Sequence, residues 1–209
     1  MKILVPTKRV PDTDQKIEVA PDGSRILDEH LSNCISPFDA IALEEAVRIS
    51  EAGGEVEILA VGIGNDDYEE QLRTALAMGA DRALRVACDQ ALDSWNVASI
   101  LKAIVDREAP DLVLMGKQAV DDDCNQAGQF LATQLDWPQA TFASKVELLG
   151  DRVRVDRETD IGVEVIEAPF PAVITVDLRL NEPRYASLPS IMRARKKPLE
   201  EIALAELGY

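Results

Sequence analysis

The residues best placed to bind a ligand lie in four loops, at residues 6–9, 36–39, 62–64 and 116–127. Glycines at positions 62, 64 and 116 would let a ligand approach the backbone closely. The helix predicted after Asp123 would present free N–H groups, which are suited to bind phosphate. The pattern therefore fits a mononucleotide site, and ordinary turns are the alternative.

The glycine motifs in these loops differ from the standard phosphate-binding signatures. Gly62 and Gly64 are not followed by the third glycine of a dinucleotide-binding fingerprint. Gly116-Lys117 lacks the upstream glycine and the following Ser or Thr of a P-loop. Neither motif identifies the ligand by itself.

The run Asp121-Asp122-Asp123 offers oxygen atoms that Mg²⁺ could bind. Consecutive side chains point in different directions, however, and rarely bind one cation together. We therefore expect Asp123 to cap the next helix or to contact a ribose, and we expect no metal site. Cys124 lies near the predicted helix start, where the pKa of a thiol falls, but the adjacent carboxylates oppose that effect. We therefore expect Cys124 to be a small, half-buried residue and not a reactive thiol.

The other residues with catalytic potential are few and scattered. Cys34, Cys88 and Cys124 are an odd number and form neither a disulfide framework nor a CxxC site. His30 lies in a polar stretch with no evident partner, so we expect a solvated loop residue and no catalytic residue. The sequence favours a carrier or binding protein over an enzyme.

Strand and helix patterns alternate around the four loops. Apolar runs predict strands at residues 3–6, 56–61, 83–86, 111–115 and 171–176. Helical patterns occupy residues 38–50, 68–78, 95–108 and 125–135. This alternation predicts an α/β fold with a three-layer parallel sheet, in which ligands bind at the carboxyl ends of the strands.

The pattern changes after residue 138. Short alternating segments at 146–149, 153–157 and 163–166 predict an antiparallel hairpin addition to one side of the sheet, spanning residues 145–167. We predict an α/β domain over residues 1–177. Residues 178–209 are expected to be mainly loop, with a short helix near 200–207.

Composition excludes several classes of function. The chain has 209 residues, 46% of them apolar, and a formal charge of −16, which disfavours binding to nucleic acid or to an anionic membrane. Its N-terminus reads as a short strand instead of a signal peptide, and no run reaches the roughly 20 apolar residues of a membrane span. These features predict a soluble protein of a reducing compartment.

One segment carries the opposite charge. Residues 183–197, which we call the docking segment, contain five basic residues, no acidic residue and the apolar residues Leu188, Ile191 and Met192. It is either a solvated connector or a surface that binds a partner through an apolar contact and attracts acidic groups. The charge contrast with the rest of the chain favours the second interpretation.

Motifs along nearly the whole chain resemble the β subunits of electron transfer flavoproteins. They are KRVPD, SPFDAIALEEAVR, TALAMGADRA, DLVLMGKQAVDDDCNQAGQ, LDWPQATFAS and PAVITVDLRLNEPRYASLPSIM. The resemblance implies an adenine-nucleotide-binding (α-hydrolase-like) fold that holds a structural AMP. It also implies an α subunit that holds most of one FAD, and a heterodimer without substrate chemistry of its own.

The same resemblance assigns residues to the AMP site by position. They are Pro6, Ser36, Pro37, Phe38, Asp39, Ile63, Gly116, Lys117, Gln118, Ala119, Val120, Asp121, Asp122, Asp123, Cys124, Asn125, Gln126 and Ala127. The family often has a small residue at the position of Pro6, Asn at Ser36 and Cys at Ile63. Phe38 matches the residue that approaches the flavin ring.

The docking segment resembles the family's recognition loop, with Leu188 as the residue that enters an apolar pocket on a dehydrogenase. The implied docking residues are Arg184, Tyr185, Leu188, Pro189, Ile191, Met192, Arg193, Arg195 and Lys196. Implied partners are the α subunit, acyl-CoA and related dehydrogenases, and a membrane quinone oxidoreductase. Most members continue beyond the position of Tyr209 with an arm that embraces the α subunit.

Two alternatives share the fold. Electron-bifurcating relatives hold a second FAD in this subunit and use NADH, but they carry a run like DGDTAQVGP where this chain has DDDCNQAGQ. ATP-using relatives need a glycine-rich triphosphate loop, which is absent from this sequence. The expected location is the bacterial cytoplasm, or the mitochondrial matrix in a eukaryote.

Overall fold

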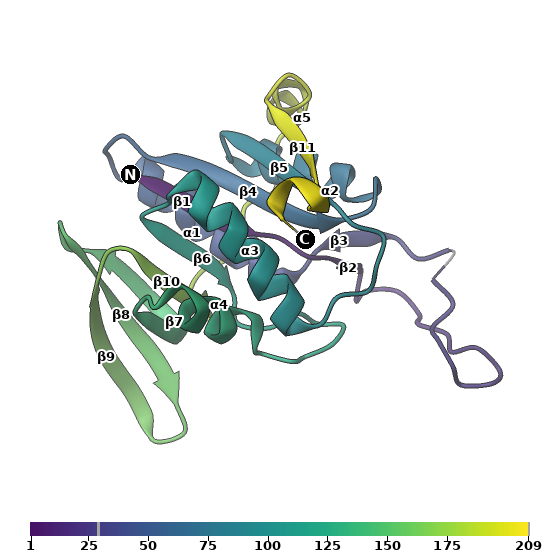
Figure 1. Ribbon diagram of the computed structural model, residues 1–209, viewed down its shortest axis with the longest axis horizontal. Helices are drawn as coiled ribbons and strands as arrows, with labels where there is room; N and C mark the ends of the chain where they lie inside the picture. Colours follow the sequence, from purple (N-terminus) through teal and green to yellow (C-terminus); the bar gives the residue numbers. More distant parts are fainter. Residues whose placement is uncertain (29, 209) are drawn as a thin grey trace.

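The computed structural model describes residues 1–28 and 30–208, in which strands and helices alternate along most of the chain (Figure 1). The main sheet contains β1 (Lys2–Pro6), β4 (Glu57–Gly64), β5 (Arg82–Ala87), β6 (Leu112–Gly116), β7 (Gln139–Leu148), β8 (Arg152–Thr159), β9 (Gly162–Pro169), β10 (Ala172–Val176) and β11 (Leu199–Ala203). The helices are α1 (Pro37–Glu51), α2 (Tyr68–Met78), α3 (Ser94–Glu108), α4 (Ala127–Leu135), α5 (Leu188–Ala194) and the 3₁₀ helix η1 (Leu204–Leu207). A separate antiparallel pair is formed by β2 (Arg9–Pro11) and β3 (Asn33–Ile35).

The main sheet has nine strands in the order β11-β5-β4-β1-β6-β10-β7-β8-β9. Every pairing from β11 to β7 is parallel, whereas β7, β8 and β9 pair antiparallel and extend one side of the sheet. The predicted α/β fold, its parallel sheet and its antiparallel addition are therefore confirmed. The division of the chain at residue 177 remains a prediction.

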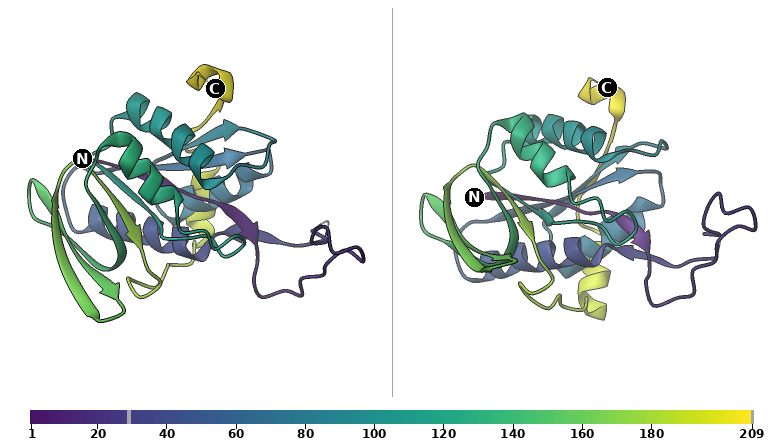
Figure 2. Two further views of the ribbon diagram at one scale, coloured as in Figure 1. Left: turned by 60° about the horizontal axis from the view of Figure 1, so that its bottom comes forward. Right: turned by 90° about the horizontal axis from the view of Figure 1, so that it is seen from below.

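Helices cover both faces of the sheet, which explains why its central strands are apolar throughout. In β1, Ile3 and Val5 face the core beneath α1 and α2, while Leu4 faces the core beneath α3 and α4. Successive side chains in a strand point to opposite faces, so each residue of such a strand is buried on one side or the other. Figure 2 shows the resulting three layers, with α1 and α5 on one face and α3 and α4 on the other.

The last part of the chain is more ordered than expected. The docking segment contains the helix α5, and residues 199–203 form β11, which pairs in parallel with β5. The prediction of a helix over 200–207 is therefore wrong except for η1. Ile202 of β11 is buried in the core beneath α3, a long-range contact that the sequence LEEIA of this five-residue edge strand does not reveal.

Residues 12–28 and 30–32 project from the body between β2 and β3 (Figures 1 and 2). His30 is exposed within this segment, in agreement with its predicted place in a polar loop. Within the described ranges, the structure contains no helix with the length and apolar character needed to cross a membrane.

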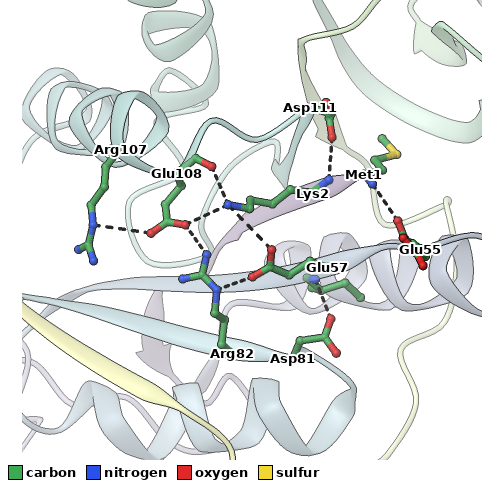
Figure 3. Close-up of polar contacts among 10 residues, drawn as sticks. Met1, Lys2, Glu55, Glu57, Asp81, Arg82, Arg107, Glu108 and Asp111 are labelled. Carbon is green, nitrogen blue, oxygen red and sulfur yellow. Dashed lines mark hydrogen bonds and ion pairs between the residues drawn. The ribbon is translucent and has the colours of Figure 1, made fainter.

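A cluster of charged residues fixes the amino-terminal edge of the sheet (Figure 3). The Glu108 carboxylate, whose side chain is 8% exposed, accepts hydrogen bonds from Arg82 and from Lys2 Nζ. Arg82 also pairs with Glu57, and the backbone N–H of Lys2 donates to Asp111 at 2.7 Å. The cluster thus connects the starts of β1, β4 and β5 with the end of α3.

We expect Glu108→Gln to lower the free energy of unfolding by about 1–3 kcal/mol, because it removes the charged partner of the half-buried Lys2 and Arg82 side chains. Burial alone would raise the pKa of Glu108, but the hydrogen bonds from Arg82 and Lys2 hold it below its ordinary value. The stabilisation should therefore be present near neutral pH and be lost as acid protonates Glu108.

Urea unfolding of both forms at pH 7 and pH 4 would measure this effect. Asp106→Asn is the matched control, since its carboxylate is on the same helix and makes an exposed pair with Lys102. The control should change stability by less than about 0.5 kcal/mol. Equal effects of the two substitutions would contradict the role assigned to Glu108.

Candidate functional site

A cavity of about 710 Å³ lies at the carboxyl ends of β1, β4 and β6. The chain runs from β1 outward to β4 and β5, then returns to β6 on the other side of β1. Loops that leave neighbouring strands in opposite directions open a crevice at this position, which is where open α/β sheets bind ligands. The cavity volume lies within the usual range for small-molecule sites.

The cavity brings together residues from all four loops singled out in the sequence. The predicted residues that line it are Pro6, Asp39, Ile63, Gly116, Lys117, Gln118, Ala119, Asp121, Asp122, Cys124, Asn125, Gln126 and Ala127. Five predicted residues are not part of its lining: Ser36, Pro37, Phe38, Val120 and Asp123. Sequence reasoning missed the wall between β5 and α3, formed by residues 88–92, because that loop has no glycine or charge motif.

Asp39 joins two edges of the cavity. This residue lies in the first turn of α1 and is 7% exposed. Its two carboxylate oxygens accept hydrogen bonds from the backbone N–H of Lys8 at 2.8 Å and of Gly116 at 3.0 Å. Burial raises the pKa of Asp39 to about 7, although both hydrogen bonds favour the ionised form. Asp39 therefore holds the ends of β1 and β6 against α1.

The glycines of these loops make room for protein side chains. A Cβ atom at Gly116 would lie 2.6 Å from Asp39 Oδ1, which is too close for any other residue. A Cβ atom at Gly62 would lie 2.9 Å from the ring of Tyr68, and a Cβ atom at Gly64 would lie closer still to the same ring. We predicted that these glycines would let a ligand approach the backbone closely. At these positions the side chains of Asp39 and Tyr68 make that close approach.

The three consecutive aspartates have two different roles. Lys8 Nζ binds Asp121 and Asp122, each at 2.8 Å, which joins the loop after β1 to the loop after β6. Asp123 does not cap the helix as predicted: α4 begins four residues later, and the Asp123 carboxylate accepts a hydrogen bond from Gln118. Its backbone has a φ of 55°, a conformation that Asp tolerates better than most residues.

The start of α4 is open toward the cavity. Gln126 occupies the N-cap position, and no side chain of the described residues caps the first turn. Gln126, Ala127 and Gly128 all line the cavity, so the free N–H groups of this turn lie beside it. The cations Lys8, Arg9 and Lys117 line the same space. Helix N–H groups with nearby cations are the donor set that suits a phosphate.

Lys117 lies between two aromatic rings at the margin of the cavity. Its Nζ is 5.5 Å from the ring centre of Phe38 and 4.6 Å from that of Phe142, and it binds Asp177 at 2.8 Å. Phe142 has a φ of 61°, which is unusual for a bulky residue. Phe38 is only 6% exposed, so this cluster fixes the ring that the family resemblance assigns to the flavin side.

The docking segment presents its apolar residues to solvent. Tyr185 is 97% exposed, Leu188 73%, Met192 54% and Ile191 40%. Pro189, Arg193, Arg195 and Lys196 are also exposed, whereas the Arg184 side chain is engaged by acidic residues of α1. Exposed large apolar side chains grouped on α5 and just before it are typical of an interaction surface.

The fold and the cavity define an α/β protein of the nucleotide-binding type. The family model described as "Electron transfer flavoprotein domain" matches residues 24–207. The chain is 49% identical to electron transfer flavoprotein subunit beta of Bradyrhizobium diazoefficiens, over 100% of this chain and 84% of the relative. It is 51% identical to the mitochondrial subunit beta of Arabidopsis thaliana, over 99% and 83% of the two chains.

The human subunit beta is 49% identical to this chain over 100% of its length and 83% of the relative. The chain therefore belongs to the electron transfer flavoprotein family and is of its β-subunit type. This finding confirms the resemblance carried by the sequence motifs.

The buried carboxyl of Asp39 predicts a pH-dependent contribution to stability. An acid with a raised pKa binds more protons when folded, so its contribution falls as pH rises from the ordinary value of 3.8 to the folded value of about 7. Wild-type protein should lose stability relative to Asp39→Asn across this range, by at most about 1.4 kcal/mol for each pH unit.

Thermal unfolding of the two forms from pH 5 to pH 8 would test this prediction. Asp89→Asn is the control, since Asp89 is an exposed carboxyl on the same cavity. The difference between Asp39→Asn and wild type should change with pH, while that of the control should stay constant. A constant difference for both would refute the raised pKa of Asp39.

Proposed function

We propose that this chain is the small subunit of a heterodimeric electron carrier and that it binds AMP in the cavity at the carboxyl edge of its sheet. The observation that carries the proposal is the location of the family motif at residues 111–129. This motif forms β6, the following loop and the start of α4, and thereby lines one whole side of the cavity.

The donors around the cavity suit a nucleoside monophosphate. The uncapped start of α4 would provide N–H donors for a phosphate, and Lys8, Arg9 and Lys117, each of which also pairs with a carboxylate of the chain, line the same cavity. Apolar residues such as Ile63, Leu92 and Val97 line another part of the cavity, where they would contact a base. AMP would act as a structural ligand that joins the loops after β1, β4, β5 and β6.

The redox chemistry would be supplied by an FAD held mainly by the α subunit. This chain would contribute the shape of one side of that site, where the buried Phe38 ring lies beside Lys117. Electrons would arrive from acyl-CoA and related dehydrogenases, as in fatty acid oxidation, and leave to a membrane quinone oxidoreductase. The heterodimer would work in the bacterial cytoplasm or the mitochondrial matrix.

The docking segment would bind the dehydrogenase. Leu188 is 73% exposed and would enter an apolar pocket on the partner. Arg193, Arg195 and Lys196 are exposed nearby and would attract acidic residues around that pocket. This chain would thus combine a nucleotide site with a separate surface for partner recognition.

The nucleotide content tests the first part of the proposal. We expect AMP, at close to one per chain, to be released when the purified chain is denatured and the supernatant is measured by mass spectrometry. FAD should appear only after co-expression with the α subunit. Release of FAD from this chain alone would instead support the electron-bifurcating alternative, and release of no nucleotide would refute AMP binding.

Leu188→Ala tests the docking surface. Burial of a leucine contributes about 1.5–3 kcal/mol, so the variant should raise the KM of a dehydrogenase for the heterodimer by roughly tenfold to a hundredfold. Steady-state kinetics with the heterodimer as electron acceptor would measure this. Leu149→Ala, which removes an exposed leucine between β7 and β8, should leave the KM unchanged. AMP content should be normal in both variants.

A further inference from the structure

The docking segment is attached to the body of the protein mainly by polar contacts. Among residues 184–197, only Ala194 belongs to the buried core and only Ala186 packs against it. A hollow of about 270 Å³ lies between the end of α2 and residues that include Arg184, Ser187 and Ser190. Apolar packing alone therefore does little to fix the position of α5.

The first attachment is made by Arg184 at the start of the segment. Its guanidinium binds Glu44 through Nε at 2.8 Å and Glu51 through Nη1 at 2.6 Å. The Glu44 side chain is 3% exposed and also binds Arg48 at 2.7 Å. Just upstream, Asn181 donates to the carbonyl oxygen of Ile41 at 3.1 Å. The entry to the segment is therefore fixed along one side of α1.

The second attachment fixes the other end of the segment to α2. Arg73 Nη1 donates to the carbonyl oxygens of Ala194 at 3.2 Å and Lys197 at 2.9 Å. In return, Lys197 Nζ donates to the carbonyl oxygens of Leu76 at 3.2 Å and Ala80 at 2.6 Å. A cation at the C-terminal end of a helix is also favoured by the helix dipole.

The two attachments divide the basic residues of the segment into two groups. Arg184 and Lys197 are bound within the chain, while Arg193, Arg195 and Lys196 are exposed and form no ion pair with any residue that the structure describes. Only the second group is free to meet a partner. Arg184, which the family resemblance places among the docking residues, has its guanidinium occupied by two carboxylates.

We propose that Arg184, Arg73 and Lys197 are positioning residues that hold α5 in its binding conformation, so that a partner dehydrogenase meets Leu188 already in place. A segment ordered before binding loses less conformational entropy in the complex, which strengthens binding without any added contact. The free residues Arg193, Arg195 and Lys196 have a different role, which is to accelerate the encounter with an acidic surface. This inference rests on the proposed docking function.

Charge-conserving variants test the inference. Arg184→Lys keeps the charge, but an ammonium group cannot bind two carboxylates as the planar guanidinium does. Arg73→Lys weakens the other attachment in the same way. The measurement is the second-order rate constant for reduction of the FAD-loaded heterodimer by a substrate-reduced acyl-CoA dehydrogenase, over a range of ionic strengths. Hydrogen exchange of the amides at 186–194 is recorded on the same samples.

We expect both variants to lower the rate constant about threefold to tenfold, with an unchanged salt dependence and faster exchange confined to residues 186–194. Replacement of Arg193, Arg195 and Lys196 by Gln should instead reduce the salt dependence and leave exchange unchanged. Lys16→Gln, at an exposed pair with Glu18, should change neither property.

The failure of the inference differs from the failure of the docking function. If Leu188→Ala slows electron transfer but Arg184→Lys and Arg73→Lys do not, the positioning role is wrong. If either lysine variant alters the salt dependence, the arginine contacts the partner directly and the inference is overturned. If Leu188→Ala has no effect, the docking function itself fails. Because the attachments lie on different helices, a folding defect in one variant leaves the other as the test.

Discussion

The hydrogen bonds of Asp39 are the interaction on which the candidate site depends. The crevice exists because the loops after β1 and β6 diverge, and such a crevice needs a group that keeps its two sides together. The Asp39 carboxylate provides it by accepting from Lys8 on one side and from Gly116 on the other. The same contact explains why residue 116 has no side chain, since any Cβ there would collide with Asp39. Burial of this carboxyl makes the contact sensitive to pH.

The acidic composition also has a structural consequence, because many of the cations are bound within the chain. Lys2 and Arg82 fix one end of the sheet, and Lys8 joins two loops at the other. Lys117 binds Asp177 and Phe38. A chain with a charge of −16 repels acidic partners except where free cations gather, and they gather at the end of the docking segment. The exposed cations at the end of the docking segment therefore mark the surface that an acidic partner would approach.

The parts of the structure that could be predicted from sequence are those set by local patterns. The helix at Tyr68–Met78 and the strands of the parallel sheet follow from periodicity and from their bounding glycines. Thirteen of the eighteen residues assigned to the nucleotide site line the cavity, because strand topology places the four loops at one edge. Two failures are long-range: β11 is defined by its pairing with β5, and the loop at residues 88–92 reaches the cavity only through the tertiary fold. The prediction that Asp123 caps the next helix is wrong for a local reason. Helix α4 begins four residues later, and the Asp123 carboxylate accepts a hydrogen bond from Gln118.

Helix α1 links the candidate cavity and the docking segment in one element. Asp39 in its first turn holds the cavity, and Glu44 and Glu51 farther along hold the start of the docking segment. Fifteen residues of α-helix span about 22 Å, and the buried face of α1 packs on β1 and β6. The helix makes both sets of contacts without a conformational change. A single helix that positions both the loops of the cavity and the start of the docking segment fixes the distance between the cavity and the exposed Leu188 within one chain.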